Sequence, residues 1–283
     1  MTSDEMPFFP FPNQDYFWFK NTVDTVHKKI KVKDALFAGG VLYAAMYKGL
    51  YPKANVTAID INPHTILCQS YLIHLIKNNN YNDCLKFLLI DKFDSYSKEV
   101  FYSKEEVKKA YDSFAEFIFL KENLKIHQSY FNKIFNLDEK KDVFAKKVSL
   151  SDGINLIEEI YKYNIPLKQP DNVYLSDILC HSDSYDFVST NNIIDWVKQP
   201  KDFVEKTSSL LNPKGIIEIS LLMGYITKNP KFVKKIQAQP NMKKLKMKNQ
   251  IYGWVQFSDP KIFPYFEIKP KQLILLQKIE DMQ

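Results

Sequence analysis

The residues most suited to chemistry are two adjacent glycines and a carboxylate twenty residues further along the chain. Gly39 and Gly40 follow the apolar run 34–38, and Asp60 ends the run 55–60, in which β-branched and small residues alternate. Glycines let a ligand approach the backbone at the start of a helix, and an acid at the next strand tip can accept hydrogen bonds from both ribose hydroxyls. The spacing therefore predicts a βαβ unit that binds a nucleoside.

The sequence after the glycines disfavours a dinucleotide. Val41, Leu42 and Tyr43 follow them, so the chain lacks the full Gly-x-Gly-x-x-Gly fingerprint that holds a pyrophosphate close to a helix. A nucleoside without phosphates fits this loop better. The alternative is an α/β protein without such a ligand, because a glycine turn and an acid at these places are common in that class. Asp177, at the tip of a third predicted strand, favours a ligand, since its side chain could reach an adenine amino group.

The elements that must position these residues alternate between strands and helices. Apolar or alternating runs predict seven strands, the last two expected to be antiparallel: 34–38, 55–60, 171–177, 185–192, 215–224, 251–258 and 271–279. Helical periodicity, with Gly49 as a C-cap and Asn62 and Pro63 starting the third helix, predicts helices at 14–30, 41–50, 63–78, 200–211 and 230–248. The turn Asn-Pro-Lys-Gly is expected to close the fourth.

The domain organisation follows from one long interruption of this rhythm. Residues 82–164 are far too many for an ordinary connection and show mostly helical periodicity, which predicts a helical insertion. We expect a single domain at 34–283, preceded by a segment at 1–33 whose aromatic start either covers the ligand as a lid or packs against the sheet. At 283 residues and 45% hydrophobic, the chain is long enough for one well-buried core.

Charge and cysteine content limit the classes of partner. The net charge of +6 is modest, so no nucleic-acid partner is expected. Cys68, Cys84 and Cys180 form no CxxC pair, which indicates reduced thiols and no metal site. No run of about 18 uncharged apolar residues predicts a membrane span, and we expect a cytoplasmic protein. The basic run Lys243 to Lys248 is either a solvated face or a peripheral contact with an anionic membrane.

Taken together, the successive blocks resemble the motifs of class I S-adenosylmethionine (SAM)-dependent methyltransferases. The blocks are DALFAGGVLYAAMY, VTAIDIN, NVYLSDIL, YDFVSTNNIIDWV and LLNPKGIIEISLL, which cover residues 34 to 222 apart from the insertion. The resemblance implies an α/β Rossmann-like methyltransferase sandwich, a mostly parallel seven-stranded sheet with an antiparallel last strand. The departure is the glycine loop, which in typical members is an acid-x-Gly-x-Gly string.

The resemblance also assigns site residues. Asp60 would hold the ribose, Gly39 and Gly40 the methionine end and Asp177 the adenine of SAM, with no metal. The full cofactor-binding set implied is Ala38, Gly39, Gly40, Asp60, Ile61, Asn62, Ser176, Asp177, Ile178 and Asn191. The implied reaction is methyl transfer to a small molecule.

The acceptor-facing residues follow the fourth strand of the fold: Asn191, Asn192, Asp195 and Trp196. An amide can orient an acceptor amine or hydroxyl, an acid can take its proton, and an indole face can favour the sulfonium. The alternative is that Trp196 begins a packed helix, with Asp195 near its N-terminus for dipole reasons. Both interpretations remain open.

Two further functions compete with methyl transfer. The segment AIDINPHTILCQSYLIHLI resembles the SAM:diacylglycerol 3-amino-3-carboxypropyl transferases, as do Leu175-Ser176-Asp177 and Asp195-Trp196. That resemblance implies attack on a different carbon of the sulfonium. The reduced glycine loop instead favours a module of the same fold that binds a nucleoside or a partner protein without catalysis.

Overall fold

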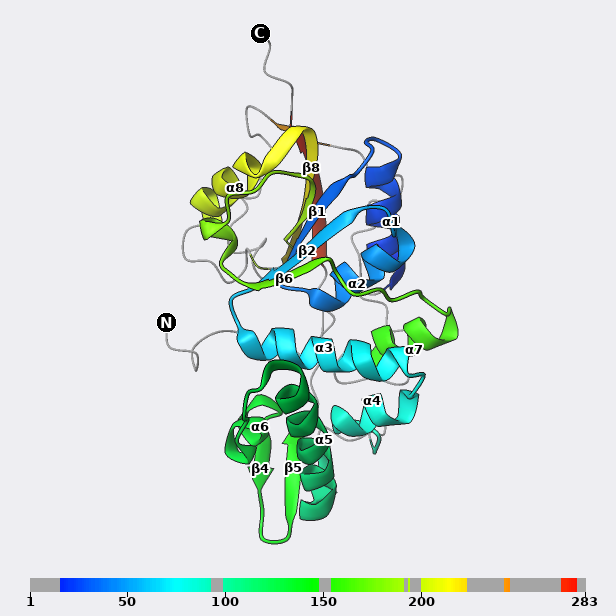
Figure 1. The fold of residues 1–283 in the computed structure, drawn as a ribbon, viewed down its shortest axis with the longest axis vertical. Coiled ribbons are helices and arrows are strands. Elements are labelled where there is room, and N and C mark those ends of the chain that lie inside the picture. Colours follow the sequence, from blue (N-terminus) through cyan, green and yellow to red (C-terminus); the bar gives the residue numbers. More distant parts are fainter. Residues whose placement is uncertain are drawn as a thin grey trace.

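The fold is built on one seven-stranded sheet with the order β6-β2-β1-β7-β8-β10-β9. The computed structural model describes residues 16–92, 99–147, 154–190, 193, 200–222, 242–244 and 271–278. The strands of this sheet are β1 Asp34–Ala38, β2 Asn55–Asp60, β6 Asn172–Leu175, β7 Tyr185–Ser189, β8 Leu211–Leu222, β9 Met242–Lys244 and β10 Lys271–Lys278. Figure 1 shows the sheet in the upper half of the molecule.

Strand directions confirm the predicted fold class. The pairs β6–β2, β2–β1, β1–β7 and β7–β8 are parallel, whereas β10 is antiparallel to both β8 and β9. Counted in chain order within this sheet, the strands lie 3-2-1-4-5-7-6, with only the seventh reversed. This is a Rossmann-like sandwich with a mostly parallel seven-stranded sheet and an antiparallel last strand, as predicted.

Helices cover both faces of the sheet. The helices α1 Tyr16–His27, α2 Val41–Leu50 and α3 Pro63–Lys77 pack on the face that bears Ala35 and Phe37. The other face, which bears Leu36 and Ala38, packs against α8 Pro200–Ser209. Successive residues of β1 therefore enter different core clusters, as the alternation of side chains along a strand requires.

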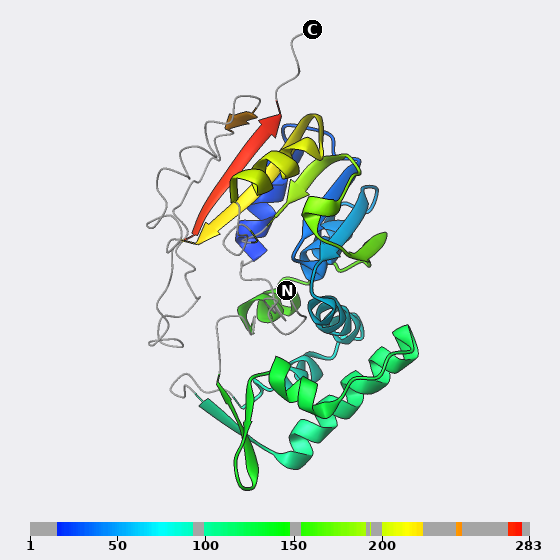
Figure 2. The same ribbon diagram turned by 90° about the vertical axis from the view of Figure 1, so that its left-hand side faces the viewer.

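The insertion between β2 and β6 is mostly helical, as predicted, but it also contains three short strands that were not predicted. Beside α4 Tyr81–Phe87, α5 Lys104–Glu122, α6 Gln128–Ile134 and α7 Ile154–Lys162, it contains β3 Glu99–Ser103, β4 Leu137–Glu139 and β5 Val143–Lys147. These strands form an antiparallel sheet of order β3-β5-β4. They escaped prediction because they are short and lie next to stronger helical signals. Figures 1 and 2 agree that this sheet and α5 lie beyond α3, away from the main sheet.

Two predictions for the C-terminal third of the sequence need correction. Met242–Lys244 is a strand, so the helix expected at 230–248 is wrong there; the rest of that stretch and the strand expected at 251–258 lie outside the described residues. The turn Asn-Pro-Lys-Gly lies inside β8, where Lys214 has a φ of +65° and the pairing with β7 shifts register. Among the helices that the structure describes, none is both long and apolar enough to cross a bilayer.

Gly49 is not a C-cap but an interior residue of α2, which continues to Leu50. A Cβ on Gly49 would lie 2.0 Å from the carbonyl oxygen of Pro166, in the segment that leads to β6. The glycine is therefore explained by close backbone contact with that segment.

We predict that Gly49→Ala destabilises the protein, although Gly to Ala inside a helix normally stabilises by about 0.5–1 kcal/mol. Pro166 must move to admit the methyl group, and overpacking of this kind costs about 1–3 kcal/mol. Urea unfolding measures the difference, with Ser129→Ala at an exposed position of α6 as the control for helix propensity. A Gly49→Ala protein more stable than the parent would contradict the close contact.

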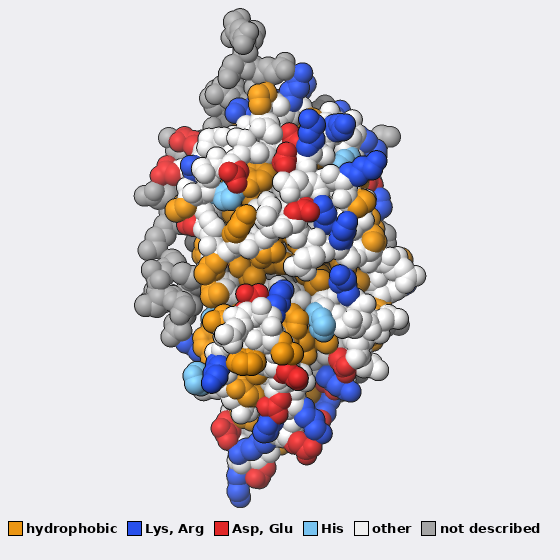
Figure 3. Space-filling model, in the orientation of Figure 1, with side chains coloured by type: hydrophobic (Ala, Val, Ile, Leu, Met, Phe, Trp, Pro, Cys, Tyr) orange, Lys and Arg blue, Asp and Glu red, His pale blue; other side chains and the backbone are white. Residues whose placement is uncertain are grey.

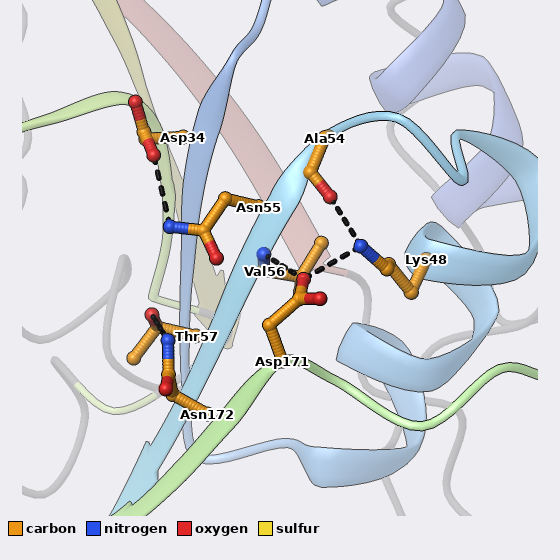
Figure 4. Close-up of polar contacts among 8 residues, drawn as sticks. All are labelled: Asp34, Lys48, Ala54, Asn55, Val56, Thr57, Asp171 and Asn172. Carbon is orange, nitrogen blue, oxygen red and sulfur yellow. Dashed lines mark hydrogen bonds and ion pairs between the residues drawn. The ribbon is translucent and has the colours of Figure 1, made fainter.

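An ion pair fixes the edge strand β6 (Figure 4). Lys48 Nζ lies 2.6 Å from Asp171 Oδ2 and donates a hydrogen bond to the carbonyl oxygen of Ala54 at 2.7 Å. The same Asp171 oxygen accepts the N–H of Val56 at 2.8 Å. One carboxylate thereby joins α2, β2 and the start of β6.

Candidate ligand-binding site

The predicted ligand residues come together because four parallel strands end at one edge of the sheet. In register, Ala38 pairs with Ile59 and Asp60 with Leu175, while Phe37 pairs with Ser189. Figure 1 shows β2 leading from this edge into the first turn of α3, on the side of the insertion. The strand order thus brings together segments that are more than a hundred residues apart in the chain.

The two glycines have different roles. Gly39 has a φ of +77°, in the left-handed region that favours glycine, and a Cβ there would lie 3.1 Å from Ile193 Cδ1. Its N–H donates to the carbonyl oxygen of Ile59 at 2.9 Å, which closes the turn onto β2. Gly40 caps α2 with extended backbone, a conformation that any residue adopts. Only Gly39 is required by backbone geometry.

One of the backbone N–H groups at the N-terminus of α2 is hydrogen-bonded to Gln69, which was not among the predicted site residues. Gln69, fully buried on α3, accepts the N–H of Leu42 through Oε1 at 3.0 Å. The first turn of a helix offers free N–H groups to an anion, and one of them is used here. The sequence feature that could have identified Gln69 is a single glutamine within the apolar run of α3.

Asp60 is buried at the strand tip beside an exposed apolar side chain. Its Oδ1 accepts the N–H of Asn62 at 2.7 Å. Burial raises the pKa of Asp60 to about 6, although the N–H groups of Asn62 and Ile61 act in the opposite direction. Asn62 is itself buried and accepts the N–H of His64 at 2.9 Å, so its side chain caps α3 as predicted. Ile61, by contrast, is 37% exposed.

We predict that Asp60 makes the folded protein less stable above pH 6 than below pH 4. Because folding raises its pKa, the folded state binds the proton more tightly, and this contribution is lost as pH rises from the unfolded value, near 4, to about 6. A shift of two units corresponds to about 3 kcal/mol at most.

The measurement is urea unfolding of the parent and of Asp60→Asn between pH 4 and 8. The free energy of unfolding of Asp60→Asn is expected to rise relative to that of the parent between pH 4 and pH 6. Above pH 6 the difference should stay constant. An advantage that does not change with pH would contradict a raised pKa.

The end of β6 lies beside Asp60. Ser176 donates its N–H to the carbonyl oxygen of Asp60 at 3.0 Å, and Asp177 caps a short 3-10 turn by accepting the N–H of Leu179 at 2.9 Å. Asp177 is exposed, whereas Ile178 is buried in the sheet core. Asp60 and Asp177, the residues predicted to bind the ribose and the adenine, are therefore neighbours.

Apolar side chains are exposed around these strand ends. Figure 3 shows hydrophobic side chains gathered across the middle of the molecule, between the upper domain and the insertion. Leu175 is 60% exposed, and Ile61 and Leu179 are also exposed. Exposed aliphatic surface beside a buried carboxylate suits a nucleobase with its ribose.

The acceptor side is only partly described. Asn191, Asn192, Asp195 and Trp196 lie outside the described residues, so their predicted roles stay predictions. Before them, the hydroxyl of Ser189 donates to Glu218 Oε2 at 2.6 Å. The sequence analysis missed Glu218; its only signal was a single acid in the very apolar strand β8.

Two histidines near these strand ends contact tyrosine side chains. His64 contacts the ring of Tyr130 on α6, with centroids 4.1 Å apart, and His181 lies 2.5 Å from the hydroxyl of Tyr185. Among the described residues, no group of three or more His, Cys, Asp or Glu side chains could hold a metal ion. The contact of His64 with Tyr130 places the insertion next to the turn that carries Asp60.

Several solved structures are similar in fold to this chain. No protein-family model and no curated protein matches the chain. The N-methyltransferase NodS from Bradyrhizobium japonicum WM9 is 9% identical, with 93% of this chain and 96% of that chain covered and a TM-score of 0.42. A SAM-dependent methyltransferase from Clostridium acetobutylicum ATCC 824 is 9% identical, with 94% and 93% covered and a TM-score of 0.41.

A tRNA m1G37 methyltransferase from M. jannaschii is also similar in fold. It is 13% identical, with 92% of this chain and 49% of that chain covered and a TM-score of 0.34. We assign the fold from the strand order and directions of this chain rather than from these similarities.

Proposed function

We propose that this protein is a SAM-dependent methyltransferase that acts on a small molecule. The observation that carries the proposal is the edge where the strand order 3-2-1-4-5-7-6 brings Gly39, with its positive φ, beside the buried Asp60. In this fold such an edge is where a nucleoside binds. Hydrogen bonds from Gly39 to β2 and from Ser176 to Asp60 support the arrangement.

The residues at the edge suit the parts of SAM. Asp60 would accept the ribose hydroxyls, and the segment Ala38 to Gly40 would approach the methionine end. Asp177 would lie beside the adenine, with the exposed side chain of Ile61 against it, whereas the Ile178 side chain is buried in the sheet core and would support the turn. When bound, SAM supplies a methyl group activated by a sulfonium.

Alignment of the acceptor is the main task of the protein in such a transfer. Asn191 and Asn192 would orient the acceptor, Asp195 would take its proton, and Trp196 would face the sulfonium. No metal is needed for these roles.

Transfer of the aminocarboxypropyl group is the second candidate. It is favoured by the start of α3, where Asn62 caps the helix and Pro63 occupies its first turn, together with the insertion that follows. A third candidate is ligand binding without catalysis, favoured by Gln69, which uses one of the N–H groups at the start of α2.

Calorimetry with SAM, followed by identification of the by-product, tests these candidates. Methyl transfer yields S-adenosylhomocysteine, whereas aminocarboxypropyl transfer yields methylthioadenosine. Bulk tRNA, added as an alternative acceptor, tests the small-molecule assignment. A protein that binds no SAM would overturn the proposal, and SAM binding without turnover of any acceptor would favour the third candidate.

A further inference from the structure

The C-terminal end of α5 carries apolar side chains that the packing of this helix leaves exposed. The buried residues of α5 recur at helical spacing: Val107, Ala110, Phe114 and Ile118. Leu120 lies one turn after Glu116, on the exposed polar row of the helix, and is 77% exposed. Phe119 is 48% exposed, and Leu124, just beyond the helix, is 53% exposed. We call these three side chains, Phe119, Leu120 and Leu124, the α5 tip.

The backbone at the α5 tip is held at both ends. Asn123 ends the helix with a φ of +52°, and its N–H donates to the carbonyl oxygen of Phe119 at 3.0 Å. Further along, the hydroxyl of Tyr111 donates to the carbonyl oxygen of Ile126 at 2.9 Å, which ties the returning chain to α5. The apolar side chains are therefore exposed by a turn with its own hydrogen bonds and not by a frayed helix end.

The α5 tip lies at a projecting corner of the molecule. Phe117 contacts Tyr71 and His74 of α3, with ring centroids 4.8 and 5.1 Å apart, and the tip begins two residues beyond this contact. Figure 2 shows the C-terminal end of α5 projecting at the right-hand edge of the molecule, on the side where β6 ends the main sheet. A convex corner can enter a soft surface.

Lysine side chains flank the α5 tip. Lys121 and Lys125 are exposed, and they outnumber Glu122, the one acid in the segment 119–127. Lys121 Nζ lies 5.5 Å from the ring centroid of Phe117, at the base of the tip. Apolar side chains flanked by lysines suit the interface of an anionic bilayer, because the apolar groups enter the acyl boundary while the ammonium groups stay among the phosphates.

We infer that the α5 tip docks this protein on an anionic lipid surface. A second protein fits the tip less well, because a standard protein interface buries about 800 Å² on each partner, more than three side chains at a corner supply. Immersion in a bilayer needs no complementary surface. With so few groups the attachment is weak and reversible. The inference is independent of the proposed function, since the tip contains none of the residues assigned to SAM or to the acceptor.

Flotation of the full chain with vesicles tests the inference. The parent is expected to bind vesicles of equimolar phosphatidylcholine and phosphatidylserine about 10- to 30-fold more tightly than phosphatidylcholine alone, and to dissociate as salt is added. Leu120→Gln combined with Leu124→Gln is expected to lower the partition coefficient by about 10- to 100-fold, because less apolar surface enters the interface. Lys121→Gln combined with Lys125→Gln should lower it by about 10- to 30-fold on the anionic vesicles alone.

The matched control is Phe101→Gln. Phe101 is also 48% exposed but lies on β3, which precedes the N-terminal end of α5, and α5 is about 28 Å long. This variant is expected to leave the partition coefficient unchanged. Leu120→Trp gives a second readout, since brominated lipids are expected to quench the fluorescence of the added tryptophan. Urea unfolding of each variant is expected to match the parent closely, because the substituted positions are exposed.

Three outcomes would overturn the inference. The first is a parent that does not bind the anionic vesicles. The second is binding that Leu120→Gln with Leu124→Gln leaves unchanged, which would place the lipid contact elsewhere, as in the basic run Lys243 to Lys248. The third is a parent that sediments as a dimer and becomes a monomer in the same double variant, which would assign the tip to a second copy of this chain. None of these results bears on SAM binding, which calorimetry tests separately.

Discussion

Asp60→Asn is expected to weaken SAM binding by about two to four orders of magnitude. Each hydrogen bond from a ribose hydroxyl to a carboxylate contributes about 1.5–3 kcal/mol, and each 1.4 kcal/mol corresponds to tenfold in Kd. The Asn side chain can still accept the N–H of Asn62, so the turn before α3 is preserved while the charge is lost. Calorimetry with SAM and with S-adenosylhomocysteine gives the two affinities.

The charge-matched control is Asp138→Asn, on the exposed surface of β4 in the insertion, which is expected to leave both affinities unchanged. Equal binding by Asp60→Asn and the parent would exclude Asp60 from the site. Because burial raises the pKa of Asp60 to about 6, binding by the parent is also expected to weaken as pH falls from 7 to 5.

The same substitution is expected to change stability in the opposite direction. An Asn at position 60 avoids the cost of a buried charge, so the variant that loses the ligand gains stability above pH 6. Such an exchange of stability against binding is common at functional sites. It would distinguish Asp60 from a residue retained only for the fold.

Asp171→Ala is expected to destabilise the protein by about 3 kcal/mol. The substitution leaves the Lys48 ammonium, whose side chain is 7% exposed, without its carboxylate, and removing one partner of a buried pair costs about 3–5 kcal/mol. Val56 also loses the acceptor of its N–H. We expect the lower end of the range because the Asp171 side chain is 38% exposed and therefore screened by water.

Urea unfolding measures this effect, and two further variants are measured beside Asp171→Ala. Asp171→Asn keeps an acceptor for Val56 and should lose less, and Lys48→Met removes the buried charge itself. In the double variant of Asp171→Ala and Lys48→Met, the losses should be less than additive, since the two side chains interact directly. Additive losses would show that the pair contributes little.

Much of the main sheet could be predicted because its signals are local. The run 34–38 ends at the glycines, Asn62 and Pro63 start α3, and the strand at 271–279 is apolar enough to be recognised. These features depend on residues within one or two turns of each other, where propensity and capping act. The strands of the insertion were not predicted because helical periodicity dominates the sequence on either side of them, as in α5 directly after β3.

The sequence by itself determined the βαβ unit, the carboxylate at the tip of its second strand and the cap of the following helix, because these are properties of neighbouring residues. Only the tertiary structure decided the rest. It placed Pro166 against Gly49, Gln69 at the start of α2 and Glu218 opposite Ser189. Each of these contacts joins residues far apart in the chain, and each was fixed by how the strands pair and the helices pack, which no local pattern records.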